Sequence, residues 1–154
     1  MEERERLIQL LIDARQKMEA VVASIDPKTP VSDPWKIKEV LDHIAGWDDA
    51  VVVSIASYIE GEIPATPAER GIDHYNAQTV STRETLSYQH SIREWRGTRE
   101  LLLKTLREMP EDKFYQPYTL PWGQHGSVPQ VIEIFSEHES THADEIQAII
   151  DQSS

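Results

Sequence analysis

Four segments of the chain carry apolar residues at alternating spacings of three and four, the pattern of an α-helix with one buried face. These segments span residues 7–25, 37–58, 88–109 and 131–149. Prolines or glycines follow the first three, and no stretch shows the period-two alternation of a β-strand. The pattern therefore predicts an all-α fold, a four-helix bundle with a longer connection between its second and third helices.

Capping residues indicate where three of these helices begin. The second helix is expected to begin at residues 32–34, where Ser-Asp-Pro combines a capping side chain with a proline in the first turn. The third is expected to begin at Ser81 or Ser87. The fourth is expected to begin at Ser127 and to run to about Asp151.

Two connections carry residues of interest. The sequence around residues 72–76 allows a short helix between the second and third long helices. Residues 110–127 are rich in proline, glycine and aromatic residues, which predicts a loop. In that loop, Tyr118, Trp122 and His125 either form a lid over a pocket or cover the end of the core.

The composition narrows the function. The chain has 154 residues, no cysteine, and 27 acidic against 15 basic side chains, a formal net charge of −12. We therefore expect one domain over residues 1–154 without disulfides or thiol catalysis, and no nucleic acid or anionic membrane as partner. Residues 1–6 are too charged for a signal peptide, and no apolar run approaches the ~18 residues of a membrane helix, so we expect a cytoplasmic location.

The last predicted helix places two histidines on its apolar stripe. His138 and His142 are four residues apart and share the face defined by Val131, Phe135 and Ile149. Such pairs also arise by chance, but burying two imidazoles costs free energy unless they are paired or coordinated. Two imidazoles one turn apart can bind one metal ion, and the sequence therefore indicates a candidate metal site.

A third ligand is required, because catalytic zinc sites use three protein ligands and leave one position open. His43 is the best candidate, since it shares a helix face with Val40 and Trp47. The other three histidines have weaker claims to a role. His90 lies off the apolar stripe of its helix, and two are in connecting segments, namely His74 and His125.

The run His138-Glu139-Ser140-Thr141-His142 also matches the zinc-protease pattern, in which Glu139 would be the general base. The long form of that pattern needs glycine and histidine where Glu145 and Ala148 stand. Only twelve residues follow His142 to provide a third ligand. A protease-like hydrolase is therefore the weaker interpretation.

Several charged residues lie near the expected site. Asp42, Asp48, Glu139 and Glu145 are the carboxylates that could orient the imidazoles. Arg99 lies on the apolar stripe of the third helix. It either forms a buried ion pair with one of these acids or binds a substrate carboxylate.

Three segments resemble the DinB-like (YfiT-like) four-helix-bundle superfamily, in an order and spacing similar to that family. Residues 35–47 contain tryptophan followed eight positions later by histidine, and residues 137–142 resemble the closing motif of the family. Residues 72–76 are similar to an element found before its third helix. The run 43–48 is similar to the ClbS/DfsB branch, and the resemblance extends from the first helix to about Ile150.

The resemblance implies a metal site of three histidines, which here are His43, His138 and His142, with zinc or nickel as the metal. It also implies thiol-dependent transferase or isomerase chemistry with bacillithiol, mycothiol or glutathione, or hydrolysis as in one branch. Homodimers are common in the family. A divalent ion at such a site lowers the pKa of water to ~7 or binds a thiol as thiolate. Because the chain has no cysteine, any thiol must be a second small molecule.

The resemblance thus implies a metal-dependent S-transferase or hydrolase that acts on a small electrophile in detoxification or stress response. It identifies no catalytic residue and no organic cofactor site. Two non-enzymatic interpretations remain open. The protein could sequester a metal or ligand, or the histidines could form an unmetallated structural cluster at a bundle whose role is dimerisation.

Overall fold

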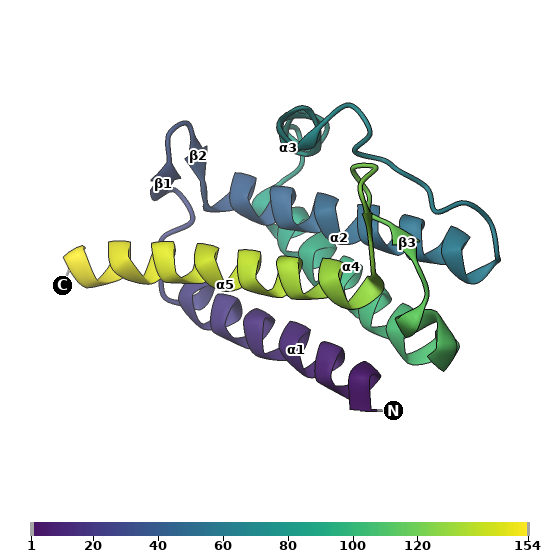
Figure 1. Cartoon of the computed structure of the whole chain (residues 1–154). Coiled ribbons are helices and arrows are strands. Elements are labelled where there is room, and N and C mark those ends of the chain that lie inside the picture. The colour runs from purple at the N-terminus through teal and green to yellow at the C-terminus, as the bar shows by residue number, and fades with distance from the viewer. Residues whose placement is uncertain (1, 154) are drawn as a thin grey trace.

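The computed structural model describes residues 2–153, most of which lie in four long helices (Figure 1). The long helices are α1 Glu2–Ala23, α2 Ile37–Ile59, α4 Tyr88–Glu108 and α5 Val128–Ser153. A shorter helix α3, Ile72–Ser81, lies in the connection between α2 and α4, and a 3₁₀ helix spans Glu111–Tyr115. The predicted all-α bundle with a longer connection between its second and third long helices is confirmed.

The four long helices pack as two pairs. α1 packs mainly along α5, and α2 mainly along α4; in Figure 1 the purple α1 and yellow α5 lie side by side in front of the other pair. Contacts across the α2–α5 seam are much sparser. The buried apolar side chains of all four stripes fill the interior, as their helical period predicts. The sparse α2–α5 seam is where the histidines meet.

Two of the predicted helix starts are confirmed by their hydrogen bonds. The Ser87 hydroxyl accepts a hydrogen bond from the backbone N–H of His90 at 3.1 Å, and α4 follows. The Ser127 hydroxyl accepts one from the backbone N–H of Gln130 at 3.2 Å, and α5 follows. Both hydroxyls satisfy donors of the first turn, which lack partners within the helix.

The predicted start of the second helix at residues 32–34 is wrong, because these residues belong to a short antiparallel hairpin with a cis Asp33–Pro34 peptide in its turn. A second hairpin lies in the 110–127 connection. The strands are β1 Pro30–Ser32, β2 Trp35–Lys36, β3 Tyr118–Thr119 and β4 His125–Gly126. Strands of two or three residues are too short to show a period of two, so the sequence did not indicate them.

The two long connections cover the same side of the bundle. α3 and the β3–β4 hairpin both lie over the α2 side, above the seam with α5 (Figure 1). The backbone N–H of Ala68 donates to the carbonyl of Pro121 at 3.0 Å, which ties the two connections together. The Tyr118 hydroxyl lies 2.5 Å from that of Ser54 and anchors the hairpin to α2. Within residues 2–153, none of the helices combines the length and apolar character needed to cross a membrane.

Candidate metal centre

Three histidines meet at the α2–α5 seam. Nε2 of His138 lies 3.1 Å from Nε2 of His43 and 3.0 Å from Nε2 of His142. The three candidate ligand atoms all lie within 4.8 Å of one another. Helical spacing explains the arrangement, because His138 and His142 are one turn apart on α5 and His43 is on the buried face of α2. The structure thus brings together the three residues that the sequence singled out.

The spacing of these nitrogens fits a divalent metal ion. Two ligands bound at 2.0–2.1 Å with tetrahedral angles lie about 3.3 Å apart, close to the distances observed here. Hydrogen bonds among the three rings explain the contact less well. Each Nε2 offers one hydrogen or one lone pair, so the single Nε2 of His138 cannot form good hydrogen bonds with both neighbours.

Burial keeps these imidazoles neutral, as metal ligation requires. Burial, with a smaller contribution from the two neighbouring histidines, lowers the pKa of His43 to about 3. Burial and the neighbouring His142 lower the pKa of His138 to about 4, although nearby carboxylates oppose the shift. Burial also lowers the pKa of His142. The Nε2 lone pairs are therefore available near neutral pH.

The Nδ1 atoms of these rings also show how well the histidines suit a metal ion. Nδ1 of His43 and Nδ1 of His142 are buried and form no hydrogen bond within the described chain. Metal-bound imidazoles normally donate this second N–H to a carboxylate, carbonyl or water. Nδ1 of His142 lies 3.0 Å from Oε1 of Glu145, although not in hydrogen-bonding geometry. Glu145 is thus the carboxylate best placed to orient a ligand.

The expectation that Asp42, Asp48 and Glu139 also orient the imidazoles is wrong for His43 and His142, because neither ring has such a bond. Asp42 instead accepts hydrogen bonds from the Ser91 hydroxyl at 2.6 Å and from Lys38 at 2.8 Å. Asp48 and Glu139 face arginines. Lys38 is one turn before Asp42 on the same helix, whereas the arginines that bind Asp48 and Glu139 come from other helices, whose packing the sequence does not reveal.

Four buried charged residues, one from each long helix, form what we call the charge cluster: Arg15, Asp48, Arg99 and Glu139. Arg99 donates twice to Asp48, both at 3.1 Å, and once to Glu139 at 2.8 Å. Arg15 donates to Glu139 at 2.9 Å and to Asp48 at 3.3 Å. Its guanidinium also lies 4.2 Å from the ring centre of Trp95. The two cations and two anions balance.

The charge cluster decides two of the open interpretations. Arg99 forms the buried ion pair and is not free to bind a substrate carboxylate. Glu139, the general base of the protease pattern, is fully buried, and both its oxygens accept hydrogen bonds from arginines. Burial alone would raise the pKa of Glu139, but Arg99 and Arg15 outweigh burial and lower it. Glu139 is therefore not placed as the general base of a zinc protease.

A cavity of 180 Å³ opens beside the histidines. It lies at the α2–α5 seam and involves α3 and the loop before β4. Its lining consists of His43, Trp47, Ile72, Asn76, Trp122, Ile134, Phe135 and His138. Trp122 thus lines a pocket, as one of the two interpretations of its loop predicts, whereas Tyr118 is buried in the core and His125 is exposed.

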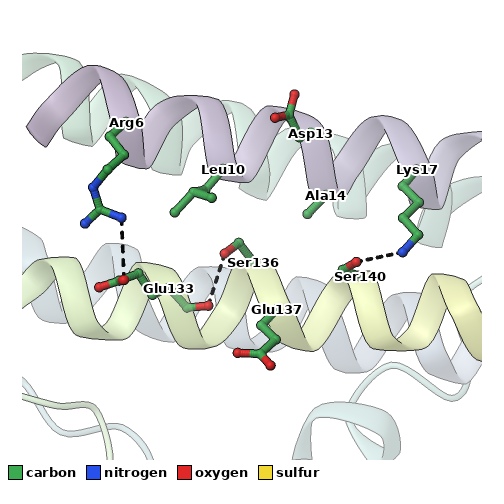
Figure 2. A pocket seen from close by; sticks show the side chains of 9 residues that line it. All are labelled: Arg6, Leu10, Asp13, Ala14, Lys17, Glu133, Ser136, Glu137 and Ser140. Carbon is green, nitrogen blue, oxygen red and sulfur yellow. Dashed lines mark hydrogen bonds and ion pairs between the residues drawn. The ribbon is translucent and has the colours of Figure 1, made fainter. Parts of the chain in front are cut away.

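A larger hollow of 450 Å³ lies between α1 and α5, away from the histidines (Figure 2). Its two basic side chains, on α1, each pair with a carboxylate on α5. Arg6 lies 3.5 Å from Glu133, and Lys17 lies 2.6 Å from Asp144. In Figure 2 the side chains that line this hollow come from two facing helices and do not converge on one point. The cavity at the histidines is therefore the better candidate for a reactive site.

Two residues of this region, Arg15 and Asn76, were not identified from the sequence. Arg15 lies four residues after Leu11 and three before Met18, so its place on the apolar stripe was a readable signal. Asn76 accepts a hydrogen bond from Nε1 of Trp47 at 2.6 Å, and no local sequence pattern predicts this contact. The remaining histidines are exposed, as the position of His90 off its apolar stripe predicts for that residue: His74, His90 and His125.

The family model of the DinB superfamily matches residues 10–146. The chain belongs to the DinB superfamily. The three histidines that the resemblance implied as ligands are the ones that converge at the α2–α5 seam of this chain. No curated protein matches this DinB superfamily chain by sequence.

Several solved structures share the fold. A mycothiol-dependent maleylpyruvate isomerase is 13% identical, with a TM-score of 0.78, over 93% of this chain and 60% of that chain. YfiT from Bacillus subtilis, described as a probable metal-dependent hydrolase with an unusual four-helix bundle topology, is 17% identical, with a TM-score of 0.76, over 99% and 89%. The colibactin self-resistance protein ClbS, solved with a dsDNA, is 14% identical, with a TM-score of 0.79, over 94% and 93%. This DinB superfamily chain spans only about 60% of the isomerase.

Proposed function

We propose that this DinB superfamily protein is a metal-dependent enzyme whose divalent ion, zinc or nickel, is held by His43, His138 and His142. The observation that carries the proposal is the convergence of three neutral imidazoles, one buried and two half-buried, beside a cavity. Imidazole nitrogens suit both metals. A metal ion with an open position supplies Lewis-acid activation of the water or thiol that it binds.

The residues around the histidines have separable roles in this proposal. The three imidazoles bind the ion, and Glu145, whose Oε1 lies 3.0 Å from Nδ1 of His142, is the carboxylate available to orient that ring. Trp35, whose ring centre lies 5.1 Å from that of His43, covers the site from the β1–β2 hairpin. The apolar lining of the cavity excludes water and holds the second reactant.

The reaction that we propose is thiol-dependent S-transfer to a small electrophile, or hydrolysis of one. The shared fold with a mycothiol-dependent isomerase supports the first, and the description of YfiT as a probable hydrolase supports the second. Because the chain has no cysteine, the thiol would be a separate low-molecular-weight compound. A role in detoxification or stress, a homodimer, a single domain over residues 1–154 and a cytoplasmic location belong to the same proposal.

Metal content tests the proposal most directly. Protein purified without a histidine tag should contain about one zinc or nickel ion per chain by elemental analysis. The His138→Ala variant should lose the ion, whereas the exposed control variant His90→Ala should retain it. The proposal fails if the protein contains no metal and neither zinc nor nickel raises its melting temperature.

Turnover separates an enzyme from a sequestration protein. Transfer of bacillithiol, mycothiol or glutathione to a chromogenic aryl halide should proceed with the wild type. It should fall to the uncatalysed rate with His43→Ala and persist with His90→Ala. Stoichiometric capture of the electrophile without turnover would instead indicate sequestration.

A further inference from the structure

The cavity beside the histidines has an unusual lining for an enzyme pocket in so acidic a protein. Among residues 2–153, no lysine, arginine, aspartate or glutamate lines it. The aromatic residues Trp47, Trp122 and Phe135 form one wall, with ring centres 5.5 to 6.3 Å apart in each pair. Two isoleucines complete the apolar surface. Without a bound metal ion, a charged group placed there would lose its hydration without gaining a charged partner.

The hydrogen-bonding capacity of the cavity is also limited. Nε1 of Trp47 donates to Oδ1 of Asn76 at 2.6 Å, and Nε1 of Trp122 donates to Oε1 of Gln124 at 2.8 Å, so both indole N–H groups are committed. The same bond fixes the Asn76 amide, because its oxygen is taken. The amide nitrogen of Asn76 has no hydrogen-bond partner among residues 2–153. Apart from the histidines, it is the one free side-chain donor among the residues that line this cavity.

The size of the cavity limits what can enter. An apolar cavity of roughly 150 Å³ accommodates a benzene ring. The 180 Å³ observed here leaves room for one ring or short hydrocarbon with a small substituent.

We propose that this cavity selects an uncharged apolar compound bearing one carbonyl group, whose oxygen accepts a hydrogen bond from Nδ2 of Asn76. The hydrocarbon part lies against Trp47, Trp122 and Phe135, and the carbonyl end lies beside the histidines. This inference rests on the proposed function, because it names the class of electrophile that the metal site would act on.

Nuclear magnetic resonance of the indole N–H groups provides the test, with benzamide, benzoate and toluene as probes. Benzamide should shift the signals of Trp47 and Trp122 in the full-length protein, both with zinc and after zinc removal. The signal of Trp95, buried in the charge cluster, should stay unchanged. In the zinc-free protein benzoate should bind at least about tenfold more weakly than benzamide, because its charge finds no cation.

Variants of Asn76 test the hydrogen bond. Asn76→Asp keeps an oxygen for the Trp47 indole but lacks the donor, and Asn76→Ala removes both. Each should weaken benzamide binding by about two- to tenfold and leave toluene binding unchanged. The exposed control Arg70→Ala should alter neither probe. If each substitution weakened the binding of benzamide and of toluene equally, Asn76 would only support the cavity wall, and its assignment as donor would be overturned.

The outcomes also separate this inference from the metal proposal. If metal is bound but benzamide shifts neither Trp47 nor Trp122, or if benzoate binds the zinc-free protein as tightly as benzamide, the inference about the cavity is wrong and the metal site stands. If no metal is found but benzamide binds as described, the cavity stands and the proposed function is wrong.

Discussion

The clustered imidazoles stay uncharged at neutral pH because the surrounding helices remove them from water. The exposed His90 has the same side chain but lies in solvent. Burial of His43, together with its two histidine neighbours, lowers its pKa to about 3. Position in the fold, rather than residue type, therefore separates the candidate ligands from the ordinary histidines.

The protein stripped of metal should lose stability as the pH falls below about 6.5, the ordinary histidine pKa. The unfolded chain binds protons there, whereas His43 and His138 in the folded state do so only at about pH 3 and 4. The unfolded state thus binds more protons, and the free energy of unfolding should fall by up to about 1.4 kcal/mol per pH unit for each histidine.

Urea unfolding at several pH values checks this expectation. His43→Asn should show a shallower pH dependence than the wild type, and His90→Asn should match the wild type. Identical slopes for all three proteins would mean that burial of His43 does not control the pH response.

At the scale of the helices, the charge cluster joins all four long elements through one buried site. Arg15 comes from α1, Asp48 from α2, Arg99 from α4 and Glu139 from α5, so each helix contributes one charge. Glu139 follows His138 directly on α5. The hydrogen bonds that hold Glu139 therefore also hold the part of α5 that carries His138 and His142. The cluster thus links packing to the geometry of the site.

Glu139→Gln should destabilise the protein by about 3–5 kcal/mol, because the two buried arginines would face one carboxylate instead of two. The matched control is Glu133→Gln, since Glu133 is exposed and lies 3.5 Å from Arg6. That control should change the free energy of unfolding by less than about 1 kcal/mol. Similar effects of both substitutions in urea unfolding would contradict a special role for the charge cluster.

A close approach of α3 to α2 depends on Gly46. A Cβ atom at this position would lie 2.6 Å from Cβ of Thr79 and would overlap its methyl group. The Tyr75 hydroxyl donates to the Gly46 carbonyl at 3.0 Å, which adds a second contact between the helices. Because α3 also carries Asn76, the contact at Gly46 sets one wall of the cavity.

Gly46→Ala should therefore destabilise the protein by about 1–3 kcal/mol and displace α3. Gly97→Ala is the matched control, because Gly97 lies in α4 with no atom within 4 Å of the added Cβ. That control should stabilise the protein by about 0.5–1 kcal/mol through helix propensity. Thermal unfolding of both variants measures the difference, and the same sign in both would refute the tight α2–α3 contact.

At the scale of the whole molecule, the formal net charge of −12 opposes binding to polyanions. This matters because ClbS, which shares the fold, was solved with a dsDNA. A shared fold at 14% identity does not carry a binding partner with it.

Mixing the protein with a DNA duplex at physiological salt should give no complex below about 100 µM protein in a gel-shift assay, because non-specific DNA binding needs clustered lysines and arginines. ClbS serves as the positive control. A complex at low micromolar concentration would show that a local basic surface overrides the net charge.

The sequence determined the helices and the faces on which His43, His138 and His142 lie, because both follow from a period of 3.6 residues within one segment. It did not show the short hairpins, whose strands are too brief for any periodicity. It also did not show the charge cluster, in which Asp48 binds Arg99 from 51 residues away. Only tertiary packing decides which faces meet: the packing of the four long helices brings each carboxylate to its arginine, and the packing of α3 on α2 brings Asn76 beside the histidines.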